Sequence, residues 1–184
     1  MALMPTNAAS LRATAEAMAQ AGSAAAVVLV EGITDRIALE TAARVRGRDL
    51  AAERVVVVPI GGAHAIGRTV AELGRTPLAG LCDLREAALF RREVTTFVCD
   101  GDLEEELIRA AGVDGVIELF ADQGDLRSFR SFQKQPAWRG QEPTAQCYRF
   151  IRSSSRRNVR YARLLTEIAV PPPLDDLLKR LIAE

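Results

Sequence analysis

The stretch that decides the fold is Ala25–Asp35, which reads Ala-Ala-Val-Val-Leu-Val-Glu-Gly-Ile-Thr-Asp. Its Val-rich apolar run predicts a buried β-strand, and Gly32 predicts the turn that leads out of it. A helical pattern follows, with Asp35 in its first turn. The strand stops at Glu31, although burying an unpaired charge costs free energy. An acid at this point predicts a functional site, provided that the fold brings other acids to it.

Three further apolar runs repeat this pattern of a strand followed by a helix. The predicted strands are 26–30, 55–60, 78–82 and 95–99, and the helices that follow them are 34–46, 65–73, 84–92 and 102–111. Near-continuous apolar strands are typical of a parallel sheet that is covered by helices on both faces. The sequence therefore predicts an α/β fold with a Rossmann-like parallel β-sheet of about four strands.

No strand pattern follows Gly112, and the rest of the chain is predicted to be helical. The expected helices there are 113–120, 126–132, 144–151, 156–168 and 174–182. We expect three parts: an N-terminal helix in residues 1–23, the α/β domain in residues 24–122, and a helical, basic C-terminal extension in residues 123–184 that packs on the same domain.

Charge is unevenly distributed along a chain whose formal net charge is +0. Residues 123–163 contain ten Lys or Arg and two Asp or Glu, whereas residues 1–122 contain twelve and eighteen. A metal site beside a groove for a polyanion would have this distribution, and an uneven surface charge is the alternative. Three cysteines and one histidine match neither a disulfide framework nor a zinc site. Without a signal-peptide pattern or a membrane-length apolar run, we expect a soluble cytoplasmic protein with no membrane partner.

Acids follow three of the four predicted strands: Glu31, Asp83 and, shortly after the fourth strand, Asp102. The carboxyl ends of parallel strands share one edge of the sheet, where ligands bind in open α/β folds. Asp35 follows Glu31 by one helical turn, and Glu104 follows Asp102 by two residues. Such oxygen ligands suit Mg²⁺ or Mn²⁺, and two such ions can clamp a phosphoryl group. The alternative is that Asp83 and Asp102 only cap helices.

Taken in order, these motifs resemble the Toprim domain. Val-Glu-Gly follows the first strand, Gly61-Gly62 the second, and Asp83 the third. The acid four residues after Glu31 and the Asp-Leu-Glu stretch at residues 102–104 are most similar to the Toprim domain of OLD-family (overcoming lysogenization defect) nucleases. The likeness extends over residues 25–111 and more weakly over the helices to residue 165.

The resemblance implies a divalent-metal-dependent nuclease that hydrolyses DNA phosphodiesters. It implies that Glu31, Asp35 and Asp83 hold one ion, that Asp102 and Glu104 hold or approach a second, and that Gly61 and Gly62 line the site. The family has a second Asp after the third strand, where this chain has Arg85, and Glu86 could substitute for it.

The family also uses a late basic residue, typically Lys. Arg157 stands in the corresponding stretch, and Arg, unlike Lys, cannot exchange protons. We therefore expect Glu31, Asp83 and Arg157 to be catalytic. OLD proteins carry an ATPase domain, so a separate ABC-type ATPase subunit is an expected partner, and a homodimer stays open.

Basic residues spaced three or four apart predict a surface for DNA. Arg149, Arg152, Arg156, Arg160 and Arg163 would form one stripe on a continuous helix, although Ser153-Ser154-Ser155 would break it. The predicted nucleic-acid contacts are Arg127, Arg130, Arg149, Arg152, Arg156 and Arg160, and the alternative is a solvated helix face.

Two other function classes compete with the nuclease. Residues 62–69 fit the spacing of a nucleotide-binding P-loop between a strand and a helix, with Arg68 in place of its lysine. The glycines of such a loop could equally serve only a tight turn. The third class is a catalytically impaired Toprim-fold module that binds DNA or protein, which need not bind a divalent ion.

Overall fold

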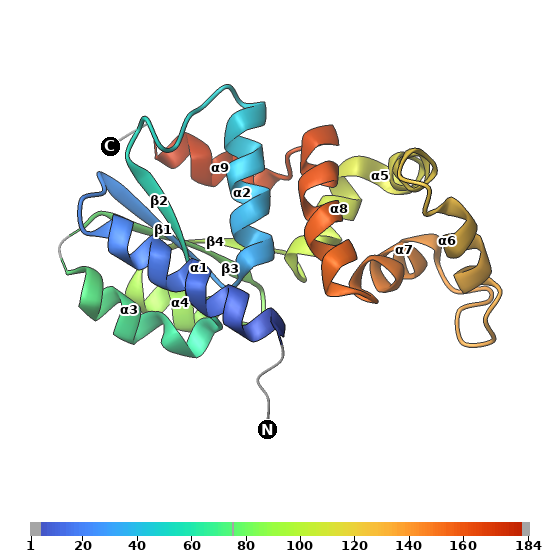
Figure 1. Ribbon diagram of the computed structural model, residues 1–184, viewed down its shortest axis with the longest axis horizontal. Helices are drawn as coiled ribbons and strands as arrows, with labels where there is room; N and C mark the ends of the chain where they lie inside the picture. Colours follow the sequence, from blue (N-terminus) through green and yellow to red (C-terminus); the bar gives the residue numbers. More distant parts are fainter. Residues whose placement is uncertain (1–4, 75, 182–184) are drawn as a thin grey trace.

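The computed structural model describes residues 5–74 and 76–181, and a four-stranded parallel sheet lies between the helices of its α/β part (Figure 1). Its strands are β1 (Ala26–Val30), β2 (Val55–Pro59), β3 (Leu78–Asp83) and β4 (Thr95–Cys99), in the spatial order β2-β1-β3-β4. Val28 of β1 pairs with Val57 on one side and with Ala79 on the other. The predicted α/β fold with a parallel sheet of about four strands is confirmed.

Helices cover both faces of this sheet, as the apolar strands predict. The helical elements of the described residues are α1 (Pro5–Ala21), α2 (Ile33–Val45), the 3₁₀ turn η1 (Ala63–Ala65), α3 (Ile66–Leu73), α4 (Ala87–Glu93), α5 (Leu103–Asp122), α6 (Leu126–Gln133), α7 (Pro143–Arg152), α8 (Ser155–Ile168) and α9 (Pro172–Arg180). Of these, α6, α7 and α8 pack mainly on other helices and not on the sheet. Val27 and Leu29 join the core under α1, α3 and α4, whereas Val28 and Val30 join the core under α2, α5 and α9. The side chains of β1 thus alternate between two buried layers.

Helix α5 turns sharply at Gly112. The sequence predicts two helices here, and α5 does consist of two helical halves separated by Gly112, whose φ of 71° and ψ of 154° are not helical. This region of backbone conformation is essentially restricted to glycine. The first half of α5 buries Leu103 and Leu107 in the core of the sheet, and the second half leads away from it (Figure 1). Gly112 therefore sets the direction in which the chain leaves the sheet.

A helical lobe, which we define as the second half of α5 with α6, α7 and α8, follows the sheet (Figure 1). Aromatic rings fill its core: the Phe120 ring centroid lies 4.8 Å from that of Phe129, 5.1 Å from that of Phe150 and 5.1 Å from that of Tyr161. Helix α8 also packs against α2, and α9 returns to β3 and β4. The predicted boundaries between the three parts of the chain, at residues 23 and 122, stay a prediction.

The basic residues between 149 and 163 do not share one continuous helix. Helix α7 ends at Arg152, and Ser154 caps α8 because its hydroxyl accepts a hydrogen bond from the Arg157 amide at 3.4 Å. Serine favours this position since its side chain can replace a missing helical hydrogen bond. The single arginine stripe, which required a continuous helix, is therefore not formed; the alternative of a break at Ser153-Ser154-Ser155 is confirmed, and the residues divide between α7 and α8.

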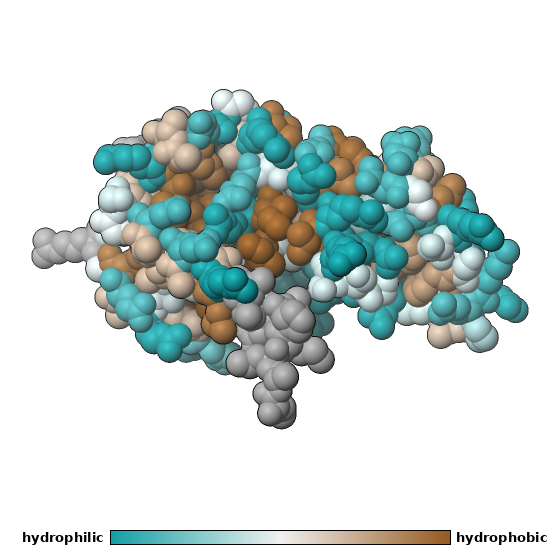
Figure 2. Space-filling view, in the orientation of Figure 1, coloured by the Kyte–Doolittle hydropathy of each residue, from teal (hydrophilic) through white to brown (hydrophobic). Residues whose placement is uncertain are grey.

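The visible surface of the helical lobe is mainly hydrophilic. Figure 2 shows teal side chains gathered over α6, α7 and α8, where several arginines are exposed. Within residues 5–74 and 76–181, we find no helix that combines the length and the apolar character needed to span a bilayer.

Replacing Gly112 by Ala is expected to lower the free energy of unfolding by about 1–3 kcal/mol. Nothing lies within 4 Å of the added Cβ, so the cost comes from the backbone conformation and not from a clash. The matched control is Gly115→Ala in the helical part of α5, where the added Cβ also meets nothing within 4 Å. The control should raise the free energy of unfolding by about 0.5–1 kcal/mol. Urea titration followed by circular dichroism measures both, and equal effects of the two substitutions would contradict this role of Gly112.

Candidate metal centre

Acidic side chains meet at the carboxyl ends of the two central strands, β1 and β3. Glu31 follows β1, and its Oε1 accepts a hydrogen bond from the amide of Asp83, the last residue of β3, at 2.8 Å. Asp83 Oδ1 in turn accepts from the amide of Leu103, the first residue of α5, at 3.2 Å. These two hydrogen bonds connect β1, β3 and α5 at one edge of the sheet.

Asp35 and the glycine loop lie next to Glu31. Asp35 Oδ2 accepts a hydrogen bond from the Gly32 amide at 2.9 Å. The backbone carbonyl of Glu31 accepts from the amides of Gly61 and Gly62, both at 3.1 Å. Both of these loop glycines have a positive φ, 74° and 116°, which side chains disfavour. The glycine loop, which we predicted to line the site, therefore holds the backbone of Glu31, a predicted metal-binding residue.

The same geometry argues against a nucleotide-binding P-loop. Such a loop cradles phosphates with free backbone amides and adds a lysine. Here the amides of Gly61 and Gly62 already donate to Glu31. The side chain of Arg68 is 79% exposed, and it lies 3.9 Å from Glu72 on the same helix.

Burial and mutual repulsion raise the pKa of four acids at this edge. The pKa of Asp83 rises to about 7, mainly through burial and then through the charge of Glu31. The pKa of Asp35 rises to about 8, again mainly through burial and then through the charge of Asp83. The pKa values of Glu31 and Glu104 are also raised, with burial as the main cause and the charge of Asp102 as a further one. We call these four acids together with the neighbouring Asp102 the acidic cluster: Glu31, Asp35, Asp83, Asp102 and Glu104.

Of the two acids for which helix capping is the alternative role, only one caps a helix in the structure. Asp83 does not cap α4, because its side chain accepts from Leu103. Asp102 does cap α5, since its Oδ1 accepts from the Glu105 amide at 3.0 Å. Glu86 is half-buried just before α4, and its charge raises the pKa of Glu31, so it lies at the margin of the acidic cluster. Arg85, which stands where the resemblance expects a second acid, is exposed.

Three side chains of the helical lobe reach Asp102 and Glu104. The Tyr148 hydroxyl donates to Asp102 Oδ2 at 2.6 Å, and Arg152 donates to the same oxygen. Arg152 Nη1 also lies 3.7 Å from Glu104 Oε2. The side-chain amide of Asn158 donates to Glu104 Oε1 at 2.6 Å. Sequence reasoning missed Tyr148 and Asn158. For Tyr148 the available signal was its spacing of four from Arg152 on α7, and no signal in the sequence pointed to Asn158 on α8.

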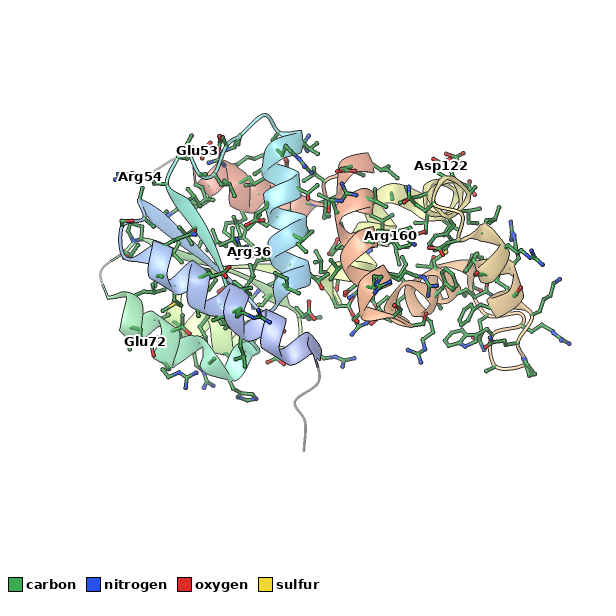
Figure 3. All side chains as sticks on the ribbon, viewed as in Figure 1. Arg36, Glu53, Arg54, Glu72, Asp122 and Arg160 are labelled. Atoms are coloured by element: carbon green, nitrogen blue, oxygen red, sulfur yellow. The ribbon has the colours of Figure 1, made fainter. Side chains whose placement is uncertain are left out.

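Arg157, which we predicted to be catalytic, belongs to a different network. Its guanidinium lies 4.1 Å from the centroid of the Phe150 ring and donates to the Phe150 carbonyl at 3.1 Å. Its Nε lies 3.7 Å from Asp125 Oδ2, an oxygen that also accepts from Arg160, whose place in the helical lobe is visible in Figure 3. Among the described residues, no hydrogen bond or ion pair joins Arg157 to the acidic cluster, whereas Arg152 makes such contacts. A catalytic role of Arg157 stays a prediction.

The six arginines that were predicted to bind nucleic acid lie in three places. Arg127 and Arg130 on α6 and Arg149 on α7 lie at the far end of the helical lobe. Arg152 lies at the acidic cluster. Arg156 and Arg160 on α8 line a hollow that α8 shares with α2. The hollow, of about 580 Å³, is also lined by Arg44 and Arg163. The role of these residues in binding stays a prediction.

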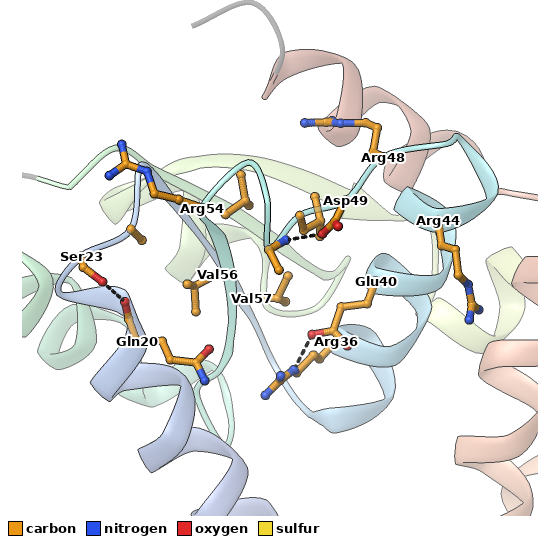
Figure 4. Close-up of a pocket in the computed structure, with 14 residues that line it drawn as sticks. Gln20, Ser23, Arg36, Glu40, Arg44, Arg48, Asp49, Arg54, Val56 and Val57 are labelled. Carbon is orange, nitrogen blue, oxygen red and sulfur yellow. Dashed lines mark hydrogen bonds and ion pairs between the residues drawn. The ribbon is translucent and has the colours of Figure 1, made fainter.

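A further hollow lies beside the edge strand β2 (Figure 4). Gln20 and Ser23 border it at the end of α1, and Arg54 borders it just before β2 begins. It therefore reaches the amino ends of the strands, opposite the edge that carries the acidic cluster. It takes no part in the candidate metal centre.

The donors of the acidic cluster fit a hard divalent cation. Carboxylate oxygens suit Mg²⁺ or Mn²⁺, and Mg²⁺ typically takes one or two carboxylates and keeps several waters. In the part of the chain that the structure describes, no three acidic, His or Cys side chains already converge as a ligand cage. A cation would nevertheless relieve the repulsion that raises the pKa of Asp83 and Asp35. The identity of the ion stays a prediction.

Fold and site together define an α/β protein with an acidic centre at the carboxyl edge of a parallel sheet. The family model for the Toprim domain of overcoming lysogenization defect protein-like proteins matches residues 24–83. These residues therefore form a Toprim domain close to that of the OLD family. No curated protein matches the sequence.

Two solved structures share the fold over most of the chain. The C-terminal region of the Burkholderia pseudomallei OLD protein is 16% identical with a TM-score of 0.61, covering 87% of this chain and 98% of that chain. The C-terminal region of the Xanthomonas campestris pv. campestris OLD protein is 19% identical with a TM-score of 0.61, covering 88% and 94%. At these identities the likeness concerns the fold, and together with the family match it confirms the predicted resemblance.

Asp35→Asn is expected to stabilise the metal-free protein at about pH 8 and to change it little at about pH 4.5. The folded pKa of about 8 lies above the ordinary value of 3.8, so the protonated carboxyl stabilises the fold at low pH. That contribution is lost as the pH rises toward the folded pKa. Asparagine carries no charge and keeps an acceptor for the Gly32 amide. We expect a gain of about 1–3 kcal/mol at the higher pH.

Urea unfolding in the presence of chelator at the two pH values measures this effect. The control is Glu118→Gln at an exposed position of α5, which should change the free energy of unfolding by less than about 0.5 kcal/mol at either pH. A gain from Asp35→Asn that is the same at both pH values would contradict the assigned pKa.

Proposed function

We propose that the chain is a divalent-metal-dependent phosphodiesterase that hydrolyses DNA. The acidic cluster is the observation that supports this proposal, because it gathers five carboxylates from distant segments at the edge where α/β folds bind ligands. Four of the five have a raised pKa, and their neighbours' charges contribute to it. Such repulsion is the electrostatic cost that a bound cation would offset.

The residues would divide between two ion positions. Glu31, Asp35 and Asp83 would hold one Mg²⁺ or Mn²⁺, with Glu86 at its margin. Asp102 and Glu104 would hold or approach a second. When bound, such ions stabilise the charge on the phosphodiester and make water a better nucleophile.

The protein's own groups supply proton transfer and orientation. In the metal-free protein the pKa of Asp83 is raised to about 7, so Asp83 would release its proton when it binds an ion. Glu31, whose carboxylate accepts a hydrogen bond from the Asp83 amide, is the candidate general acid or base. Arg152 lies between Asp102 and Glu104 and can donate to a phosphate oxygen, while Tyr148 orients the Asp102 carboxylate.

The exposed arginines of the helical lobe support DNA as the substrate. Residues 123–163 carry a large excess of positive charge, and arginines bind a phosphate backbone in a salt-dependent way. By analogy with the family, the proposal includes a separate ABC-type ATPase subunit as a partner. A homodimer is the other assembly to test.

Asp83→Asn and Glu31→Gln are each expected to lower metal-dependent plasmid nicking at least about 100-fold, because each removes a carboxylate from the centre. The assay compares Mg²⁺, Mn²⁺ and chelator with purified wild-type protein. Glu118→Gln serves as the control and should nick at the wild-type rate. Wild-type nicking that persists in chelator, or that both cluster variants retain, would overturn the proposal.

A non-catalytic module that binds DNA or protein is the second candidate. The observation that favours it is the bond between Arg152 and Asp102, because an internal cation already compensates part of the acidic cluster. A module of this kind would bind DNA in a salt-dependent way and would show no nicking under any metal condition. Calorimetric titration with Mg²⁺ or Mn²⁺ separates the two candidates, since a live nuclease must bind an ion.

Arg152→Ala is expected to lower the nicking rate about 10- to 1,000-fold and to leave or tighten binding of the divalent ion. The substitution removes a donor for the phosphate, and it also removes a positive charge that competes for Asp102 and Glu104. Arg152→Lys should restore part of the rate, because it keeps the charge but loses the fork of donors. Weaker ion binding in Arg152→Ala would show that Arg152 only supports the fold of the cluster.

A further inference from the structure

A groove at the far end of the helical lobe is not used by the acidic cluster. Residues of α6, of the loop that follows it and of α7 line this groove. Its volume is about 590 Å³. We call it the aromatic groove, and its main lining residues are Arg127, Ser131, Phe132, Gln135, Trp138 and Arg149.

A supported tryptophan forms one wall of the aromatic groove. The rings of Trp138 and Phe132 are stacked, with centroids 5.1 Å apart and an interplanar angle of 28°. Phe132 in turn contacts Phe150 at 5.7 Å between centroids, so the column reaches the core of the lobe. The side-chain amide of Gln146 donates to the Trp138 carbonyl at 2.7 Å and anchors the loop. Trp138 itself is partly exposed, which leaves a flat apolar surface held at the border of the groove.

Positive charge without internal partners lies on both sides of this tryptophan. Arg127 on α6 and Arg149 on α7 are exposed, and among the described residues their guanidinium groups make no hydrogen bond or ion pair. No acidic residue lines the groove. Unpaired arginines beside an exposed aromatic surface favour a ligand that is both anionic and aromatic.

We propose that the aromatic groove binds an unpaired DNA strand, with a base stacked on Trp138 and phosphates bound by Arg127 and Arg149. Stacking on an aromatic side chain and tracking of the backbone by basic residues are how proteins hold single strands. Duplex DNA offers no free base to stack on Trp138, because its bases already stack on one another. This inference rests on the proposed function and deepens it, since it makes DNA with a single-stranded segment the substrate class.

Helix α7 connects the groove to the acidic cluster. Arg149 lines the groove, and Arg152, three residues later and about 4.5 Å further along the helix, binds Asp102. Side chains three apart are neighbours on a helix surface. A strand held in the groove would therefore enter the acidic cluster within a few nucleotides of the stacked base.

The tryptophan makes a direct test possible, because the chain contains a single one. The full chain is titrated in chelator with an oligothymidine strand, with a blunt duplex, and with an abasic strand of equal length. We expect saturable quenching of tryptophan fluorescence by the oligothymidine strand alone. Equal quenching by the blunt duplex or by the abasic strand would overturn the proposal, since neither offers an unpaired base.

Variants then assign the affinity to the groove by anisotropy of a labelled strand. Trp138→Ala should weaken binding about 5- to 100-fold, whereas Trp138→Phe, which keeps an aromatic surface, should stay within about fivefold of wild type. Arg127→Ala should weaken it and reduce its salt dependence. Arg68→Ala, on α3, is the matched control and should leave binding unchanged. Unchanged affinity of a folded Trp138→Ala variant would overturn the proposal.

The experiment separates this inference from the proposed function because it needs no metal and no cleavage. Strand binding with Trp138 quenching in a protein that never nicks DNA would support the groove and overturn the nuclease. Metal-dependent nicking without any quenching would support the nuclease and overturn the groove.

Discussion

The hydrogen bond from the Asp83 amide to the Glu31 carboxylate is the interaction on which the candidate centre depends. It exists because β1 and β3 are parallel neighbours, with Val30 opposite Leu81, so Glu31 and the last residue of β3, Asp83, lie at the same edge of the sheet. A carboxylate at the end of a buried strand must find donors, because burial without them is costly. The amide of the next strand supplies one donor, and the remaining repulsion appears as raised pKa values of Asp83 and Asp35.

The helical lobe completes the centre from the other side. Gly112 turns α5 away from the sheet, and the aromatic core around Phe120 fixes the helices that follow. Those helices return Arg152 and Asn158 to the acids at the start of α5. The oxygen of the Asn158 amide is buried without a partner among the described residues, and it is the polar atom of the lobe that a ligand at Glu104 could satisfy.

The two charge regions of the chain are therefore in contact and not merely different in composition. Arg152 is the point of contact, because it binds Asp102 while its neighbours on α6 and α7 remain exposed. Under the proposed function, this arrangement would place a negatively charged strand between a basic lobe and an acidic centre that holds cations. The same arrangement explains why the net charge of the whole chain, +0, carries no information about its ligand.

The sequence by itself determined the sheet, its four strands and the meeting of Glu31 and Asp83. The apolar runs are local patterns, and strands that pair in parallel have their carboxyl ends at one edge. Only the tertiary structure decided which basic residue reaches the acids: it is Arg152, whereas Arg157 packs on Phe150. It also decided the contact of Tyr148 with Asp102, 46 residues away. Such contacts depend on how the helical lobe packs against the sheet, and no spacing within one element encodes that packing.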